Sequence, residues 1–317
     1  NNTYQNNAAR KTSGTFTFSN MKLAKYINCI FHGNIIQSRG SVVYAYKISN
    51  VLVSSCSFIR AEPSPDAGVF HANDVKIVLV MKTYFGESLT KDASVGKFVA
   101  CNTVFVAKCS LVKSHARQSG GGGFYFDESS RIVVLETIFH NNIARKGACI
   151  YATKTKHLTV QKSKLQDNLA TSEGGGIFID NKDIKMKSKV NIIKTLFYKN
   201  HAAYDGSAVS IKMVQNVLFA SMKLASSSAI STLTAVLSLQ IKALYMQNVE
   251  FTNVSIGIVE IKAMVFSLAR FTNVACDCPS SAYLNQISSQ TNSNKAFLVS
   301  YRCEYCKDNF YMIYHFA

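Results

Sequence analysis

Four cysteines near the end of the chain have the spacing that most directly predicts chemistry. They form a Cys-x-Cys pair and a Cys-x-x-Cys pair with 24 residues between them, at Cys276, Cys278, Cys303 and Cys306. Two such pairs can hold Zn²⁺ tetrahedrally through four thiolates. In an oxidising compartment the same cysteines pair as disulfides. The spacing alone leaves both interpretations open.

Two aspartates occupy similar settings further back in the chain. Asp127 follows Phe-Tyr-Phe and Asp180 follows Ile-Phe-Ile, so we place both in one column of a repeated unit, two repeats apart, with Ala152 between them. Cleavage of an acidic polysaccharide needs carboxylates that hold Ca²⁺ beside a basic group, or an acid–base carboxylate pair. Only 18 residues are acidic, and we interpret the densest group, Asp180–Asp183, as a solvated corner. We therefore predict no catalytic site, metal site or cofactor, with a polysaccharide lyase or glycoside hydrolase as the alternative function.

A repeat that covers most of the chain must position these residues. The unit is a glycine turn, a short apolar strand, a polar corner and a second strand that ends at a Phe or Leu. A fixed period in the twenties is typical of a solenoid, in which each unit buries its apolar face against its neighbours. The Phe or Leu position is filled by Phe31, Phe58, Phe85, Leu111, Phe139, Leu165 and Phe197, and, after an irregular stretch at 207–243, by Phe251 and Phe271.

The second strand of the unit carries columns of inward residues at seven, five and two positions before the Phe or Leu. Residues two apart lie on one face of a strand, and stacking at ~4.8 Å per coil turns each column into a ladder. In the last repeat we assign these columns to Met264, Phe266 and Ala269. The pattern predicts an all-β protein: a loose lead-in at 1–13, a parallel β-helix over 14–275, and a short cysteine-rich module at 276–317.

Glycine and asparagine are expected at the corners of the coils. Glycine takes positive φ at no steric cost, and we place one at each tight corner. Asparagine tolerates the left-handed region and can hydrogen-bond along the stack. The glycine column is Gly40, Gly68, Gly96, Gly122, Gly147, Gly175 and Gly206, and the asparagine column is Asn34, Asn142, Asn168 and Asn200.

Two outward columns indicate a contact surface, because long exposed apolar ladders are unusual on a monomer. The alternatives are that a loop covers them, or that the inside–outside assignment is shifted by one residue. On the second strand the column is Leu52, Leu79, Phe105 and Val133. On the glycine strand the candidate contact stripe is Val43, His71, Val99, Tyr125, Ile150, Phe178 and Val209.

The formal net charge of +17 favours polyanionic partners, and the alternative is a merely solubilising lysine surface. We predict no nucleic-acid binding, since that would need a basic groove interleaved with stacking aromatics. The most apolar window, Ala229–Met246, contains Gln240 and Lys242 and falls short of the ~20 apolar residues of a membrane span. The sequence starts at Asn1 without an initiator Met or a basic-then-apolar leader, so we expect any signal peptide or membrane anchor to lie outside this sequence.

The repeats resemble those of chlamydial polymorphic outer-membrane proteins and of related protist surface proteins. Those repeats pair a Gly-Gly-Ala-Ile-like strand with a Phe-x-x-Asn corner. The first motif corresponds to Gly-Gly-Gly-Phe at 121–124 and Gly-Gly-Gly-Ile at 174–177. The second corresponds to residues 31–34, 139–142 and 197–200. The resemblance covers roughly 14–275 and implies a right-handed, single-stranded, pectin-lyase-like β-helix, exported and serving as an adhesin or surface stalk.

The last residues resemble the opening of cysteine-rich modules related to ephrin-receptor and growth-factor-receptor (EGF-like) repeats, through Cys303, Cys306 and the following Asn-Phe-Tyr. For an exported chain we expect the four cysteines of this module to form disulfides, and Asn253 fits a glycosylation sequon. The five remaining cysteines fall mostly in interior columns, where we interpret them as small hydrophobes.

The expected function is a non-catalytic extracellular or cell-surface protein, adhesive or structural, that presents a long basic and partly apolar face. Its expected partners are other surface proteins, a second copy of itself, or acidic polysaccharide. These expectations follow from the charge, the outward columns and the implied export.

Overall fold

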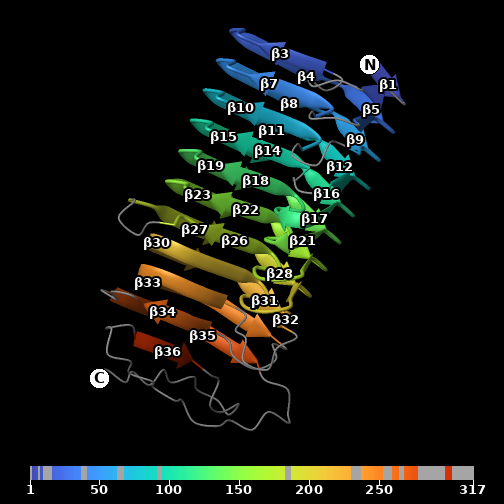
Figure 1. Ribbon diagram of the computed structural model, residues 1–317. Helices are drawn as coiled ribbons and strands as arrows, with labels where there is room; N and C mark the ends of the chain where they lie inside the picture. The colour runs from blue at the N-terminus through green and yellow to red at the C-terminus, as the bar shows by residue number, and fades with distance from the viewer. Residues whose placement is uncertain are drawn as a thin grey trace.

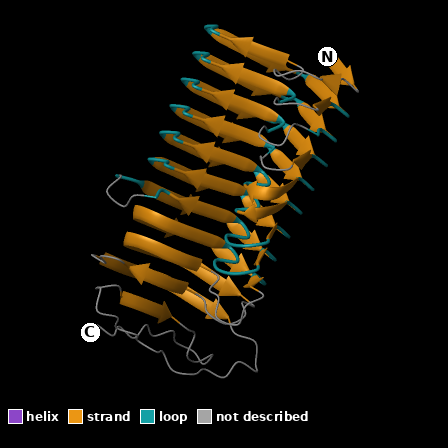
Figure 2. Ribbon diagram, in the orientation of Figure 1, coloured by secondary structure: helices purple, strands orange, loops and turns teal. Residues whose placement is uncertain are grey.

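The computed structural model is one stack of strands that run parallel from coil to coil (Figure 1). It describes residues 2–5, 8–9, 16–36, 41–62, 68–90, 95–182, 187–229, 237–252, 259–263, 268–277 and 297–301. Every element of regular structure in these ranges is a strand, as Figure 2 shows. The predicted all-β parallel β-helix is therefore confirmed, whereas the cysteine-rich module stays a prediction.

Each coil contributes one strand to a glycine face and one to a middle face, and each strand pairs in parallel with its equivalents in adjoining coils. The glycine face contains β3 (Phe16–Ser19), β7 (Val43–Tyr46), β10 (Phe70–Asn73), β14 (Gly96–Val99), β18 (Phe124–Asp127), β22 (Ile150–Thr153) and β26 (Ile177–Asp180). The middle face contains β4 (Leu23–Ile27), β8 (Asn50–Ser54), β11 (Ile77–Met81), β15 (Thr103–Ala107), β19 (Arg131–Leu135), β23 (His157–Gln161) and β27 (Lys189–Ile193). Two long strands, β30 (Val209–Ala220) and β33 (Leu237–Thr252), continue through both faces.

A third face and a short fourth sheet close each coil. The third face contains β5 (Cys29–His32), β9 (Ser57–Ile59), β12 (Tyr84–Gly86), β16 (Ser110–Val112), β20 (Ile138–His140), β24 (Lys164–Gln166), β28 (Leu196–Tyr198) and β31 (Lys223–Ala225). The fourth sheet contains β13 (Leu89–Thr90), β17 (His115–Gly120), β21 (Ile143–Lys146), β25 (Leu169–Ala170), β29 (His201–Ala202) and β32 (Ser228–Ala229).

The first and last described strands attach to the ends of this stack. At the start, β1 (Asn2–Gln5) pairs with β5, and β2 (Ala8–Ala9) pairs with β6 (Ile35–Ile36). At the end, β34 (Val259–Ala263) and β35 (Leu268–Asp277) pair with β33. The last strand, β36 (Phe297–Tyr301), runs antiparallel to β34.

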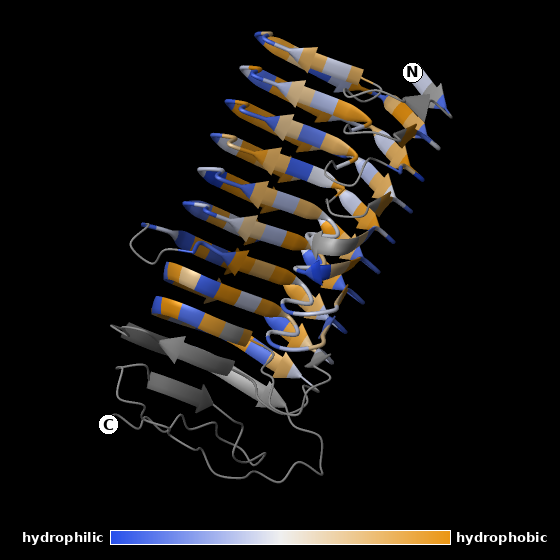
Figure 3. Ribbon diagram, viewed as in Figure 1, coloured by the Kyte–Doolittle hydropathy of each residue, from blue (hydrophilic) through white to orange (hydrophobic). Residues whose placement is uncertain are grey.

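The core is built from columns of like residues, as the period of two in the middle strands predicts. Val78 and Val80 are fully buried, while Leu79 between them points outward and is half-buried. Figure 3 shows the resulting alternation of hydrophobic and hydrophilic residues along the strands. The Phe column stacks face to face: the ring centroids of Phe31 and Phe58 lie 4.6 Å apart, and those of Phe58 and Phe85 lie 5.0 Å apart.

The stretch predicted to be irregular, 207–243, contains an ordinary coil. Leu224 pairs in register with Phe197 of the coil before and Phe251 of the coil after. The coil was missed because Leu replaces Phe and Ser227 replaces the corner asparagine. Ser227 still accepts a hydrogen bond from the backbone N–H of Asn200, at 3.3 Å.

The last repeat was assigned to the wrong residues. In the structure Cys276, and not Phe271, is in register with Phe251, and Phe271 is opposite Met246. Ala269 is likewise opposite Leu244, whereas Met264 and Phe266 lie outside the described residues. The repeat here is 25 residues long, from Phe251 to Cys276. An alignment on Phe271 therefore places the end of the repeat five residues too early. Strand β35 extends to Asp277, so the ladder runs two residues past the expected boundary at 275.

Most corners in the described part of the chain are turned by a single non-glycine residue in the left-handed region. Lys82 (φ 49°) and Lys108 (φ 55°) are two such residues after middle strands. Their backbone N–H groups donate to the next coil at Ala107 O (3.0 Å) and Leu135 O (2.9 Å). These hydrogen bonds hold a conformation that costs an L-residue roughly 1–2 kcal/mol.

Two kinds of glycine occur before the strands of the glycine face. Gly147 and Gly206 have positive φ, at 58° and 67°. Gly122 and Gly175 are required for a different reason: a Cβ atom would lie 2.6 Å from the carbonyl oxygen of Ala148 in the first case and 2.2 Å from that of Ser207 in the second. Close backbone approach between coils, and not the turn alone, selects glycine here.

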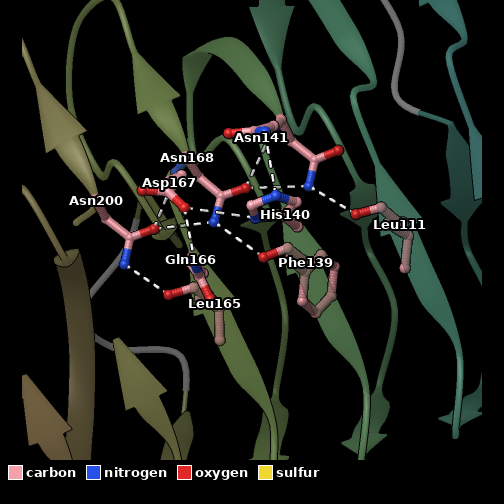
Figure 4. Close-up of polar contacts among 10 residues, drawn as sticks. Leu111, Phe139, His140, Asn141, Leu165, Gln166, Asp167, Asn168 and Asn200 are labelled. Atoms are coloured by element: carbon pink, nitrogen blue, oxygen red, sulfur yellow. Dashed lines mark hydrogen bonds and ion pairs between the residues drawn. The ribbon is translucent and has the colours of Figure 1, made fainter. Parts of the chain in front are cut away.

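The asparagines form a buried ladder, as predicted (Figure 4). The side-chain amide of Asn142 donates to Asn168 Oδ1 at 3.0 Å, and that of Asn168 donates to Asn200 Oδ1 at 2.9 Å. The backbone N–H of Asn142 also donates to Asn168 Oδ1, at 3.0 Å. The left-handed residue is the one before each asparagine, such as Asn141 (φ 54°). The ladder therefore satisfies polar groups that the corner would otherwise leave buried and unpaired.

We predict that Asn168→Ala lowers the free energy of unfolding by about 3 kcal/mol, because it leaves the buried N–H groups of Asn142 without an acceptor. The measurement is the midpoint of urea unfolding. Asn102→Ala is the matched control, since Asn102 is exposed, and it should change the midpoint little. Equal effects of the two substitutions would contradict a stabilising ladder.

Candidate functional site

The glycine face presents one outward side chain per coil in a continuous column. We name five of these residues the tyrosine strip, and all five are half-buried: Tyr44, His71, Lys97, Tyr125 and Tyr151. The next coil adds Phe178, which is in register with Tyr151 and fully buried. Strands β7 to β22 position the strip, because side chains of a strand alternate between the core and the outside.

Three residues of the predicted contact stripe point inward instead. Val43, Ile150 and Val209 are each 0% exposed and belong to the core. The positive-φ glycine that begins a coil is Gly121 in the glycine run 120–123, Gly174 in the run 174–176, and Gly147 in the coil between them. Because the predicted stripe aligns Gly147 with Gly122 and Gly175, which follow those glycines, the intervening coil is shifted by one residue. A shift of one residue exchanges the two faces of a strand.

Other members of the predicted stripe lie where expected. His71, Tyr125 and Phe178 share the outward column. Val99 also points outward, but in the neighbouring column, opposite Asp127. Three members of the strip were not predicted from the sequence: Tyr44, Lys97 and Tyr151. For Tyr44, the alternation Tyr-Ala-Tyr at 44–46 indicates an outward position.

The rings of the strip contact one another along the stack. Ring centroids are 4.9 Å apart between Tyr44 and His71 and 5.1 Å apart between Tyr125 and Tyr151, each pair edge to face. Lys97 lies between these pairs, with its Nζ 5.9 Å from the centroid of Tyr125. Tilted aromatic contacts of this kind hold the rings in fixed orientations.

Phe178 is closed off from solvent by charged side chains. The Nζ atoms of Lys146 and Lys212 lie 4.6 Å and 5.4 Å from its ring centroid. Both lysines are ion-paired with Glu173. Burial opposes ionisation of Glu173, but Lys212 and Lys146 outweigh it and lower the pKa of this carboxyl. The open part of the strip therefore ends at Tyr151.

One polar atom of the strip, His71 Nε2, and two in the neighbouring column, Asp127 Oδ1 and Thr153 Oγ1, are buried and have no hydrogen-bond partner among the described residues. Burial, with the nearby charge of Lys97, lowers the pKa of His71 to about 3. Burial raises the pKa of Asp127 against the opposing charge of Lys154. Unpaired buried polar atoms are rare and call for an explanation.

Asp127 and Asp180 do share a column, as predicted, but Thr153 and not Ala152 stands between them. Ala152 points into the core and is 0% exposed. Two rungs place the aspartate backbones roughly 10 Å apart. Across the ranges that the structure describes, no three His, Cys, Asp or Glu side chains are grouped to hold a metal ion.

The outward column predicted on the middle face is confirmed. Leu52, Leu79, Phe105 and Val133 are in register over four coils and half-buried. Three further half-buried hydrophobics flank them in the same strands. The whole set, which we name the apolar band, is Leu52, Ile77, Leu79, Met81, Phe105, Val133 and Leu135.

Five cysteines in the described part of the chain are free and buried. The interpretation of interior thiols is confirmed, and Cys56 donates to the backbone oxygen of Tyr26 at 3.4 Å. Cys276 lies in β35, whereas Cys278, Cys303, Cys306 and the sequon at Asn253 lie outside the described residues. The five buried thiols are Cys29, Cys56, Cys101, Cys109 and Cys149.

No family model, curated protein or solved structure matches the chain. Among the described residues there is also no helix long and apolar enough to cross a membrane. The faces of the β-helix are therefore the features that bear on its function.

We predict that His71 makes the protein less stable as the pH falls below 6.5. In the unfolded state the histidine has an ordinary pKa near 6.5 and is protonated below that pH. In the folded state the His71 ring stays neutral until about pH 3. The loss is about 1.4 kcal/mol per pH unit, or about 2 kcal/mol at pH 5. Urea unfolding at pH 7 and pH 5 measures it. In His71→Gln the decrease in the free energy of unfolding from pH 7 to pH 5 should be smaller by that amount. An unchanged decrease would contradict the assignment of this effect to His71.

We predict that the buried thiols resist alkylation in the folded protein. Burial raises the pKa of Cys109 to about 11 and that of Cys101 to about 12, so little reactive thiolate exists at pH 8. Treatment with iodoacetamide at pH 8, followed by peptide mapping, should leave the five buried cysteines unmodified. Complete modification in urea is the control. Rapid native labelling of any of the five would contradict its placement in the core.

Proposed function

We propose that this chain is a non-catalytic extracellular surface or structural protein whose middle face binds other proteins. The apolar band carries the proposal: seven half-buried hydrophobic side chains lie side by side over four coils. Soluble monomers rarely expose a contiguous apolar patch of this kind unless it is used for binding. The band lies on strands that are fully paired on both edges, so its shape is fixed before any partner arrives.

A row of lysines follows the middle strands at the next corner, and we name it the basic corner: Lys82 and Lys108 beside the band, and Lys162 and Lys194 in the coils beyond it. Each stands in the left-handed position directly after its middle strand. Glu136 occupies the same position in the coil between, 3.8 Å from Lys108 and 3.7 Å from Lys162. Repeats at ~4.8 Å place these charges in a line parallel to the band. The complementary partner has an apolar strip bordered by carboxylates.

The central column of the band has polar ends. It begins at exposed Lys25 and, beyond Val133, continues as Thr159 and Asn191. The apolar surface itself extends into the coil before Leu52, because Leu23 and Ile27, which flank Lys25 on β4, are exposed.

The location of the protein is part of the same proposal. The Phe-x-x-Asn corners, whose asparagines form the buried ladder, support the resemblance to bacterial and protist surface repeats. A place at the cell surface, an adhesive or structural role, disulfides among the C-terminal cysteines and glycosylation at Asn253 all follow from that resemblance. Acidic polysaccharide is the other ligand that the basic corner suits.

The proposal is tested by selecting peptides from a random display library on the wild-type protein. We expect enrichment of peptides that combine hydrophobic residues with Asp or Glu, because these complement the band and the basic corner. Phe105→Asp should weaken the selected peptides at least about tenfold, since it places a charge in the middle of the band. Thr159→Asp is the matched control, in the same column but beyond the band, and should leave their affinity nearly unchanged.

Different outcomes separate the alternatives. Peptides that bind wild type and Phe105→Asp equally would contradict the band as a binding site. Retention on heparin or polygalacturonate that is lost in Lys108→Ala/Lys162→Ala, with no enriched peptide, would assign the face to acidic glycan instead. New reducing ends or unsaturated products in those glycan incubations would contradict a non-catalytic role.

A further inference from the structure

Strands β3 and β4 lie at one end of the stack (Figure 1), and exposed hydrophobic side chains gather in the coil that contains them. Seven large hydrophobic side chains are exposed among the described residues, and five of the seven belong to the segment 21–35. These five are Met21, Leu23, Ile27, Ile30 and Ile35. Hydrophobic side chains that are exposed together, and not singly over the surface, mark a site of interaction.

The backbone of β4 is open along one edge. Asn28 N donates to Ser54 O at 3.1 Å, so Asn28 and the residues two and four positions before it face β8. Successive residues of a strand direct their N–H and C=O groups to opposite edges, which places those of Leu23, Lys25 and Ile27 on the other edge. No strand in the described part of the chain pairs with that edge. Such a row of backbone groups is a template for an added strand.

The core beside this edge is also less completely covered than in the next coil. Ala24 and Tyr26 are 6% and 7% exposed. Val51 and Val53, their partners in the next coil, are 1% and 0% exposed. An added strand would place every second side chain over this end of the core and complete its burial. A ligand that continues the β-helix by one rung therefore gains hydrogen bonds and apolar contacts together.

The outer side chains of β4 select the sequence of that strand. Leu23 and Ile27 are 44% and 48% exposed and flank exposed Lys25. The complementary strand has a hydrophobic, an acidic and a hydrophobic residue at the matching positions, because apolar pairs and opposite charges stabilise neighbouring strands. This order is the same in both directions, so it applies to a parallel and to an antiparallel strand.

A second copy of the chain fits this edge poorly. The register that pairs all of β4 with itself about a two-fold axis would place the two Lys25 side chains opposite each other, and like charges in that position are destabilising. The formal net charge of +17 adds repulsion between whole molecules. Lysine on an edge strand is a common protection against self-pairing. Lys25 therefore disfavours a copy of this chain and favours an acidic strand.

We propose that the open edge of β4 is a docking site for an extended segment of another protein, in which an acidic residue is flanked by hydrophobic residues. The segment adds one strand to the middle face through backbone hydrogen bonds to Leu23, Lys25 and Ile27. Its carboxylate pairs with Lys25, and its inward hydrophobic side chains cover Ala24 and Tyr26. The site is separate from the apolar band, which lies on strands that are paired on both edges.

The test is fluorescence anisotropy of a labelled synthetic peptide with the core Val-Val-Glu-Val-Val between Ser-Gly flanks, titrated with the whole chain. The wild-type protein should bind this peptide saturably. Lys25→Glu should raise the Kd about tenfold, because it replaces an attraction with a repulsion. A second peptide, with Lys in place of Glu, should show the reverse preference and bind Lys25→Glu more tightly than wild type.

Backbone pairing is tested separately by N-methylation, which removes the N–H donors of the modified peptide residues. One peptide is methylated at the second and fourth core residues, and another at the first, third and fifth. Only one of these two sets faces β4 in a given strand direction. One peptide should therefore lose binding, and the other should retain it.

Matched variants separate this site from a general charge effect and from the middle-face proposal. Lys189→Glu makes the same charge change at an exposed lysine of β27, a strand that is paired on both edges, and should leave the Kd within about twofold. Phe105→Asp disrupts the apolar band three coils away and should also bind the peptide normally. Failure of the band and failure of the β4 edge are therefore distinguishable.

Three results would overturn the inference. The first is a wild-type chain that does not bind the peptide saturably. The second is equal binding by wild type and Lys25→Glu, which would place the peptide elsewhere on the surface. The third is an equal effect of the two methylations, which would exclude pairing with a strand edge.

Discussion

The backbone hydrogen bonds between successive coils are the interaction on which the rest of the structure depends. Phe124 N donates to Cys149 O at 2.8 Å, and equivalent bonds repeat along every face. Because each bond fixes which residue lies above which, a single register governs the core, the corners and the surface. The same bonds hold Lys82 and Lys108 in the left-handed region, so a local cost is offset by the stack as a whole. Charged side chains can therefore stand at corners that glycine would ordinarily occupy.

Register also explains how the coils tolerate unequal lengths. Leu165 and Phe197 are 32 residues apart in the sequence, yet they are direct partners in adjoining coils. Most of the additional residues fall in the sequence between β26 and β27. Loop closure adds little cost for a few extra residues, whereas a slip within a strand would turn a core column outward. The fold therefore constrains the sequence strictly along the strands, whereas it tolerates changes at the corners.

The same physics decides what the sequence could predict. The middle strands of the first seven coils were assigned correctly because their inward residues, such as Val78 and Val80, keep a constant distance from the following Phe or Leu. The glycine strands were not, because glycine serves two purposes here: Gly147 turns the chain, whereas Gly175 makes room for a carbonyl oxygen. Aligning one kind with the other moved Ile150 from the core to the predicted surface. The coil around Leu224 was missed for a related reason, since Ser227 satisfies the corner that asparagine usually fills. The two kinds of glycine, and the serine that replaces asparagine, are distinguished only by contacts between coils, which the sequence does not show.

The outer columns are where a β-helix can vary without cost to its fold. Replacing outward Leu79 leaves Val78 and Val80 in place, so the core places no demand on what the middle face displays. One rigid backbone thus carries an apolar band on one face and a tyrosine strip on the next, with a single corner between them. Since rung spacing fixes the distance between successive side chains, a ligand with a matching repeat meets a surface already arranged for it. Little conformational entropy is then lost on binding, and this favours extended ligands over compact ones.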